Sequence, residues 1–107
     1  MTTMYISGPI TGRPVAEYTN HFAAVTARFE NEGYEVYNPV PKGQVLIDKH
    51  KREGKAFPTE EEFMATFYQE ILFSMDVIVL LDGWEDSEGA KEELGVAIER
   101  GVEVRFE

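Results

Sequence analysis

Apolar residues recur along this 107-residue chain in short runs, separated by longer segments in which apolar and polar positions mix. Four runs, two of them alternating with polar residues, have glycine, asparagine or aspartate on at least one side, which is typical of β-strands. They cover residues 4–7, 34–37, 77–81 and 102–106. The run at 77–81 is continuous and rich in β-branched residues, as in a central strand of a parallel sheet with both faces covered.

Two of the segments between these runs repeat apolar residues every three or four positions, as the buried face of an α-helix does. The first covers residues 16–32 and ends at Gly33, a residue type common after helix ends. The second follows Ser87 and ends at Gly101. Its apolar stripe comprises Ala90, Leu94, Ala97 and Ile98.

A further helix begins at Pro58–Thr59, because Thr59 and Glu62 have the spacing of a capping box. It must end by Asp76, where the continuous apolar run follows. The segment before it, residues 40–58, contains five of the ten basic residues and has no clean periodicity. We therefore expect an irregular basic loop, either a mobile flap over an anionic ligand or a solvated loop that balances the acidic helices.

The predicted order of elements is βαβαβαβ. Right-handed crossovers then place helices on both faces of an open parallel sheet with strand order 2-1-3-4. This is a reduced doubly wound, flavodoxin-like α/β fold of about four strands and three helices. We expect it to form a single domain, residues 1–107. Ligands of such sheets bind beyond the carboxyl ends of the strands, where the winding reverses. Residues 8–12 and 82–89 are therefore expected to build the site.

Composition narrows the function classes. Twenty acidic against ten basic residues give a net charge of −10, which disfavours duplex nucleic acid as a partner. The chain has no cysteine, so disulfides and thiol chemistry are excluded, and with only His21 and His50 as imidazole ligands we expect no structural zinc. No stretch approaches the ~20 apolar residues of a membrane span, so we expect a soluble, cytoplasmic protein with no membrane partner.

Neither expected loop carries a dinucleotide-binding or Walker motif, but the second one begins a helix. Ser87 and the backbone N–H groups after it can form an anion site there, although an ordinary serine N-cap gives the same pattern. Glu93 lies six residues further on, about 9 Å along the helix axis and at the edge of the apolar stripe. It is either a carboxylate turned toward the sheet or a solvated surface group.

Three other features of the second half of the chain have either a functional or a purely structural interpretation. Trp84, the only tryptophan, can stack on a base, cap the core or form a subunit contact. Asp76 is interpreted as a helix-stop residue bonded to nearby backbone. The loop acids fit no EF-hand spacing, so we expect them to be solvated and to bind no metal. They are Asp82, Glu85, Asp86 and Glu88.

The segments YISGPITG at 5–12, DVIV at 76–79 and SEGAKEELGVA at 87–97 resemble the nucleoside 2-deoxyribosyltransferase superfamily, including its 2′-deoxynucleoside 5′-monophosphate N-hydrolase branch. Their order and spacing agree over most of the chain. The chain is similar in particular to small phage and bacterial proteins of this superfamily that begin with YISGPITG. The G-x-x-x-E-x-G-x-A pattern of the superfamily is met by Gly89, Glu93, Gly95 and Ala97.

This resemblance implies that Glu93 is the nucleophile that attacks C1′ of a deoxyribose, as in a retaining glycosidase. It implies that Tyr5 orients Glu93 or the sugar, where the alternative is a buried strand aromatic, and that Ser87 holds a 5′-phosphate. The remaining substrate-binding positions would be Gly8, Pro9, Ile10, Gly12, Gly89 and Trp84. The resemblance also implies no metal or other cofactor and a homo-oligomer, dimer or larger.

The chain departs from the superfamily at two points. Pro9 and Thr11 stand where the hydrolase branch has a serine and an arginine for phosphate. The acid that assists departure of the base should lie at position 68, which holds Tyr68, and the nearest carboxylate, Glu70, is about 200° further round the helix.

Two functions remain open from the sequence, apart from a structural protein with no ligand. The first is cleavage or transfer at the N-glycosidic bond of 2′-deoxynucleoside 5′-monophosphates or deoxynucleosides, with hydrolysis favoured. The alternative is a non-catalytic nucleotide-binding sensor or sequestering protein of the same fold.

Overall fold

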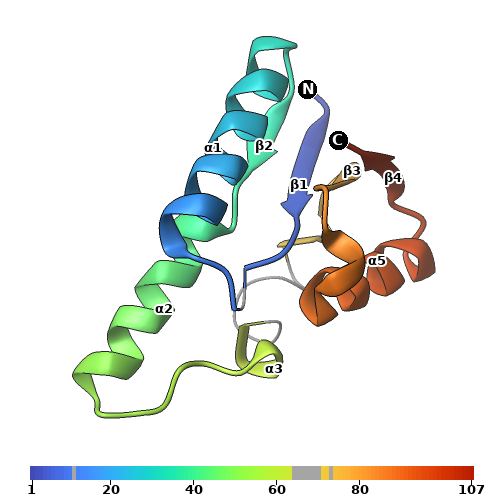
Figure 1. The fold of residues 1–107 in the computed structure, drawn as a ribbon. Helices are drawn as coiled ribbons and strands as arrows, with labels where there is room; N and C mark the ends of the chain where they lie inside the picture. The colour runs from blue at the N-terminus through green and yellow to red at the C-terminus, as the bar shows by residue number, and fades with distance from the viewer. Residues whose placement is uncertain (11, 64–70, 73) are drawn as a thin grey trace.

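A four-stranded, all-parallel sheet forms the centre of the computed structural model, which describes residues 1–10, 12–63, 71–72 and 74–107 (Figure 1). The strand order is β2-β1-β3-β4. The strands are β1 (Thr3–Ser7), β2 (Glu35–Tyr37), β3 (Val77–Leu80) and β4 (Glu103–Phe106). The predicted doubly wound sheet and its strand order are confirmed.

The described helices connect and cover these strands. They are α1 (Val15–Asn31), α2 (Val40–Arg52), α3 (Glu60–Phe63) and α5 (Glu88–Glu99), with a 3₁₀ turn, η2 (Trp84–Asp86), directly before α5. Among these helices, none combines the length and the apolar content that a membrane span requires.

The two faces of the sheet pack against different helices, because side chains alternate along each strand. We call the first cluster the α1-side core; it comprises Met4, Ile6, Tyr18, Phe22, Val25, Phe29, Val40, Val77, Val79 and Leu81. The second, the α5-side core, comprises Tyr5, Ile47, Phe63, Leu72, Ile78, Leu80 and Ala97. Successive residues of β1 therefore belong to opposite faces.

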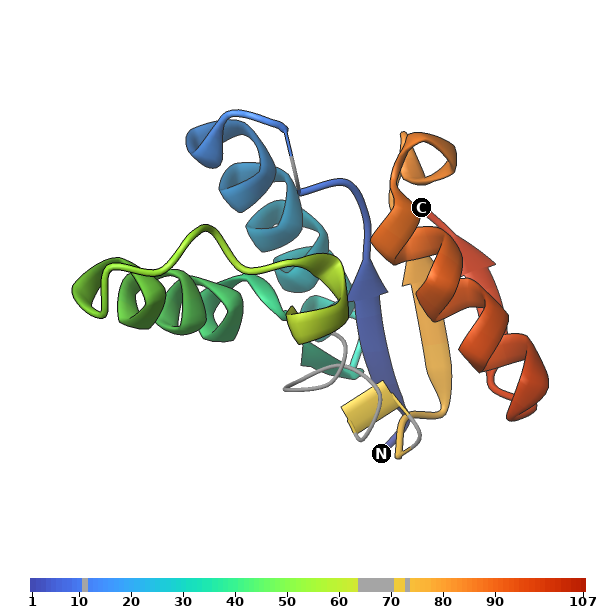
Figure 2. The ribbon, with the colours of Figure 1, turned by 90° about the horizontal axis from the view of Figure 1, so that it is seen from below.

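The expectation of an irregular loop over residues 40–58 is wrong, since α2 occupies Val40–Arg52. Its buried positions, Val40, Gly43, Ile47 and His50, have helical spacing, but glycine and histidine at two of them hide the periodicity. Pro41 in the first turn suits a helix start. In both views of the ribbon, α2 projects away from the sheet (Figures 1 and 2).

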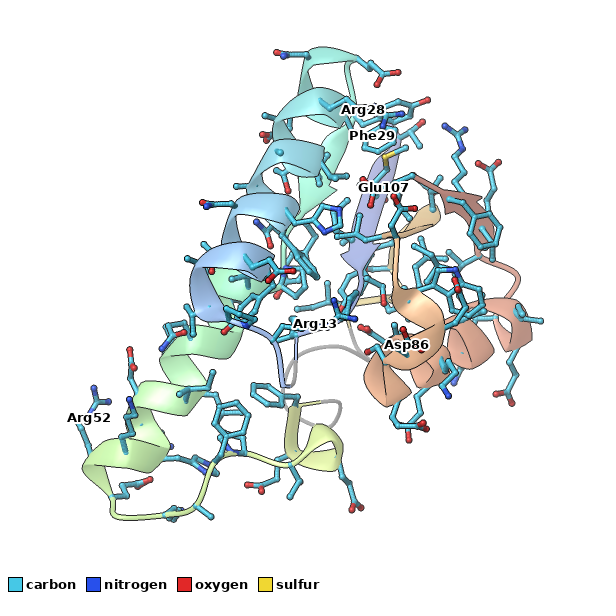
Figure 3. The ribbon with its side chains drawn as sticks, viewed as in Figure 1. Arg13, Arg28, Phe29, Arg52, Asp86 and Glu107 are labelled. Atoms are coloured by element: carbon cyan, nitrogen blue, oxygen red, sulfur yellow. The ribbon has the colours of Figure 1, made fainter. Side chains whose placement is uncertain are left out.

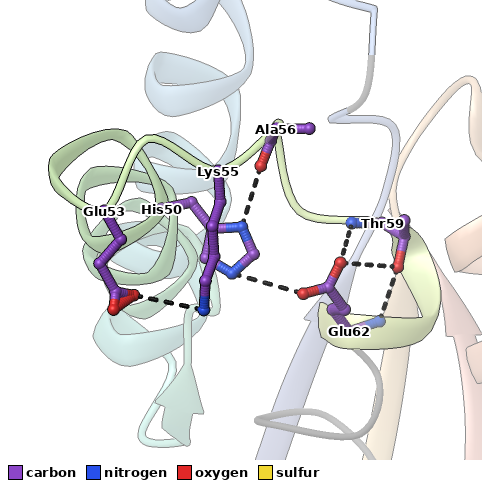
Figure 4. Close-up of polar contacts among 6 residues, drawn as sticks. All are labelled: His50, Glu53, Lys55, Ala56, Thr59 and Glu62. Carbon is purple, nitrogen blue, oxygen red and sulfur yellow. Dashed lines mark hydrogen bonds and ion pairs between the residues drawn. The ribbon is translucent and has the colours of Figure 1, made fainter.

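The capping box predicted before α3 is present. Glu62 N donates to Thr59 Oγ1 at 3.1 Å, and Thr59 N donates to Glu62 Oε1 at 3.2 Å (Figure 4). The buried His50 of α2 joins this turn, because its Nδ1 donates to Ala56 O at 2.9 Å and its Nε2 lies 3.4 Å from Glu62 Oε2. The helix expected after Thr59 is described only at Glu60–Phe63 and at residues 71–72.

Candidate active site

Helix α5 brings Glu93 onto the face of the sheet. The helix begins after Ser87, whose Oγ accepts a hydrogen bond from Ala90 N at 3.1 Å and so acts as the N-cap. This start places Ala90, Glu93 and Ala97 on the buried side, while Ile98 is 65% exposed. Ile98 was therefore wrongly assigned to the buried stripe, and Glu93 lies within that stripe rather than at its edge.

The Glu93 carboxylate is buried and bonded to β1. The residue is 6% exposed, so Glu93 is not a solvated surface group. Ser7 Oγ donates to Glu93 Oε1 at 2.8 Å, across 86 residues of sequence. A buried carboxylate costs free energy unless hydrogen bonds compensate it, so this contact fixes the position of the carboxylate at the carboxyl end of β1.

Two tyrosine rings continue the same face toward β2. Tyr5 lies two residues before Ser7 and is fully buried. It is paired with Tyr37 of β2, and the two rings stack with centroids 5.6 Å apart and an angle of 11° between their planes. Burial raises the pKa of the Tyr37 phenol. Lys42, from the first turn of α2, places its Nζ 5.5 Å from the centroid of the Tyr37 ring.

The loops after β1 and β3 lie side by side at the carboxyl edge of the sheet. A Cβ added at Gly83 would lie 3.4 Å from Pro9 Cγ and 3.6 Å from a guanidinium nitrogen of Arg13. Figure 3 shows Arg13 and Asp86 at this end of the molecule. The strand order thus brings together the two loops that were expected to form the site, and Arg13 adds a positive charge between them.

The glycines of these loops have different structural roles. A Cβ at Gly8 would lie 2.9 Å from Leu81 Cβ, so Gly8 lets β1 and β3 approach each other, and Gly12 has a φ of +79°. Ile10 packs against the α1-side core, and Gly89 lies in the first turn of α5.

The C-terminal residue of the chain fixes the loop after β3. Glu107 Oε1 accepts from Asp82 N at 2.8 Å and lies 2.6 Å from His21 Nε2 on α1 (Figure 3). Trp84 is half-buried against the α5-side core, with its ring centroid 6.0 Å from that of Phe106. Its contacts here are packing contacts at the β4 edge.

Asp76 lies at the other end of the sheet and has a structural role there, through hydrogen bonds with Thr3, 73 residues away in the sequence. Its Oδ2 accepts from Thr3 N at 2.9 Å and from Thr3 Oγ1 at 3.1 Å. The backbone hydrogen bond from Thr3 lowers the pKa of the Asp76 carboxyl. This carboxylate joins the amino ends of β1 and β3 and is remote from Glu93.

Ser7 and Arg13 were not identified from the sequence. Ser7 was recognisable from the alternation of β1, which puts residues 5 and 7 on one face, but nothing local indicated a carboxylate opposite it. Tyr68 and Glu70, the two candidates for an acid, lie outside the described residues. The described part of the chain contains no group of three or more histidine, aspartate and glutamate side chains that could hold a metal ion.

Comparison with known proteins gives one family. The profile of a family described as a domain of unknown function, DUF4406, matches residues 2–106. That family is grouped in the nucleoside 2-deoxyribosyltransferase-like clan. Neither the curated proteins nor the solved structures contain a match to the chain. Because the matched residues include both loops, the Ser7–Glu93 pair and the whole sheet, the chain belongs to the DUF4406 family.

Proposed function

We propose that this protein hydrolyses the N-glycosidic bond of 2′-deoxynucleoside 5′-monophosphates, with Glu93 as the nucleophile. One observation carries the proposal: a carboxylate that is 6% exposed and bonded to Ser7 Oγ at the carboxyl edge of a doubly wound sheet. An apolar side chain would serve the packing of α5 better, because a buried carboxylate is costly to desolvate. Such groups concentrate at functional sites.

The reaction would proceed in two displacements. In the first, a Glu93 oxygen forms a bond to C1′ while the C1′–N bond breaks; the electron pair of that bond leaves with the base, which takes up a proton from solvent. In the second, water attacks C1′, the electron pair of the ester bond returns to Glu93, and the proton from water passes to solvent. Ser7 would hold the carboxylate in orientation, and Tyr5 would orient the sugar.

Ser87 and Arg13 support a 5′-phosphate in the substrate. Ser87 Oγ accepts from Ala90 N, so its hydroxyl hydrogen is directed elsewhere and can donate to a phosphate oxygen. The N-terminus of α5 also favours negative charge. Arg13, beside the same loops, supplies a cation in a chain whose Pro9 and Thr11 replace the phosphate-binding residues of the hydrolase branch.

The protein would then be a member of that hydrolase branch and would act as a homo-oligomer. The second candidate is a nucleotide-binding protein without turnover, which Tyr68 in place of an acid favours. The two functions differ in what Glu93 does. A binder gains nothing from a buried carboxylate that faces an anionic ligand, whereas a hydrolase requires it.

Base release from a panel of 2′-deoxynucleoside and ribonucleoside 5′-monophosphates, followed by chromatography, tests the proposal. Wild type should release a base, and Glu93→Gln should lower the rate by about 10³-fold or more. Glu92→Gln is the matched control, because it makes the same change one residue away on the exposed face of α5. Free deoxynucleosides should react more slowly than their 5′-monophosphates.

Two results would overturn the proposal that the protein is a hydrolase. Absence of release together with nucleotide-induced thermal stabilisation would establish the binding protein instead. Release that Glu93→Gln leaves unchanged would remove Glu93 from the chemistry.

A further inference from the structure

The hydroxyl of Tyr37 is buried and has no hydrogen-bond partner among the described residues. A buried phenol normally finds a partner, since leaving the O–H unpaired costs free energy. The ring itself is well held, stacked on Tyr5 and within 5.5 Å of the Lys42 ammonium. A phenylalanine would keep the stack without the cost, so packing does not account for the hydroxyl.

Tyr37 lies on the face of the sheet that carries Glu93, on the strand next to β1. It is the last residue of β2 and is paired with Tyr5, two residues before Ser7 on the face that carries Glu93. A nucleotide with its phosphate at the start of α5 and C1′ at Glu93 carries its base on the side away from the phosphate. That side faces β1 and β2, where Tyr5 and Tyr37 stack.

We propose that Tyr37 donates a hydrogen bond to an acceptor atom of the nucleobase and stabilises the base as it departs. This inference rests on the proposed function and adds a catalytic residue to it. Negative charge develops on the base as the C1′–N electron pair moves onto it, and a fixed donor in a dry site stabilises such charge. The hydroxyl acts by donation alone, so no proton is transferred from Tyr37.

The protonation state of the phenol suits this role. Burial raises the pKa of Tyr37, which keeps the hydroxyl neutral and able to donate at neutral pH. Position 68, where the resemblance implies a carboxylic acid, holds a tyrosine in this chain. In a chain without an acid at that position, a hydrogen-bond donor from β2 would stabilise the departing base instead.

Tyr37→Phe tests the inference because it removes only the hydroxyl. We expect kcat/KM for base release from deoxynucleoside 5′-monophosphates to fall about 10- to 100-fold. The melting temperature of the ligand-free protein should stay unchanged or rise, since an unpaired buried O–H is removed. The loss should be smaller with a 7-methylguanine deoxynucleotide, whose base leaves without developing negative charge.

Tyr34→Phe is the matched control. The Tyr34 hydroxyl accepts from an Arg105 guanidinium nitrogen at 3.0 Å, away from Glu93. This variant should lose stability and keep its rate of base release, the opposite of the pattern expected for Tyr37→Phe.

Four outcomes overturn the inference. Unchanged kcat/KM in Tyr37→Phe, with Glu93→Gln inactive, refutes the role of Tyr37 and leaves the proposed function standing. A lowered melting temperature like that of Tyr34→Phe assigns the hydroxyl to the fold. Base release in wild type that survives Glu93→Gln, or no base release at all, refutes the proposed function and the inference with it.

Discussion

The two faces of the sheet are built from alternate residues of the same strands, yet they differ in chemistry. Toward α1, β1 presents Met4 and Ile6, and the buried α1-side core there is built mainly from aliphatic and phenylalanine side chains. Toward α5, the same strand presents Tyr5 and Ser7, and the helix opposite contributes a buried carboxylate. Because side chains alternate with a two-residue period, one strand can contribute to the hydrophobic core on one face and to a polar site on the other.

The α1 face should dominate stability, which truncation of Phe22 tests. Phe22 is fully buried in the middle of α1, so Phe22→Ala leaves a cavity and should lower the free energy of unfolding by about 3–5 kcal/mol. Thr19→Ala, on the exposed side of α1, should change it by no more than about 0.5 kcal/mol. Urea unfolding measures both, and a loss below about 1 kcal/mol for Phe22→Ala would contradict this division between the faces.

On the α5 face, removal of one hydroxyl should affect both stability and activity. Ser7→Ala leaves the buried Glu93 carboxylate without the hydrogen bond to Oε1, and hydrogen bonds to charged groups contribute about 1.5–3 kcal/mol. Ser74→Ala removes a hydrogen bond of the same 2.8 Å length that is local and exposed, so it should cost far less.

The comparison of these two serines tests whether burial increases the contribution of the Ser7 hydrogen bond to the free energy of unfolding. Unfolding by urea and base release should both be impaired in Ser7→Ala and nearly unchanged in Ser74→Ala. Equal losses of stability in the two variants would show that burial adds nothing.

A carboxylate with a structural role gives the smallest expected effect. The Thr3 backbone hydrogen bond lowers the pKa of Asp76, so the ionised form stabilises the fold at neutral pH, and this stabilisation is lost as pH falls through the lowered pKa. Asp76→Asn should lower the melting temperature at pH 7, and its difference from wild type should shrink below about pH 4. Base release should not change. A difference that is constant from pH 7 to pH 3 would exclude ionisation as the cause.

Much of the fold was predictable because the signals are local. The stripe of α1, the capping box at Thr59 and Glu62, and the run at 77–81 are patterns of neighbouring residues, and chain topology rules turned them into the strand order. Helix α2 was missed because Gly43 and His50 occupy two of its buried positions. Neither residue is strongly hydrophobic, so the helical pattern is not visible in the sequence. Gly43 has no side chain to expose, and the ring of His50 is buried with a hydrogen bond to Ala56 O.

The amino-acid pattern was enough to predict the sheet and the position of both loops at its carboxyl edge, and the family resemblance indicated Glu93 as the nucleophile. The folded arrangement was needed to show that Glu93 is buried, that Ser7 holds it and that Tyr37 stacks on Tyr5 with a buried hydroxyl. These contacts join residues that are far apart in the sequence. Periodicity reports which way a side chain faces, but the partner that compensates a buried carboxylate lies 86 residues away and is set by strand register and helix placement.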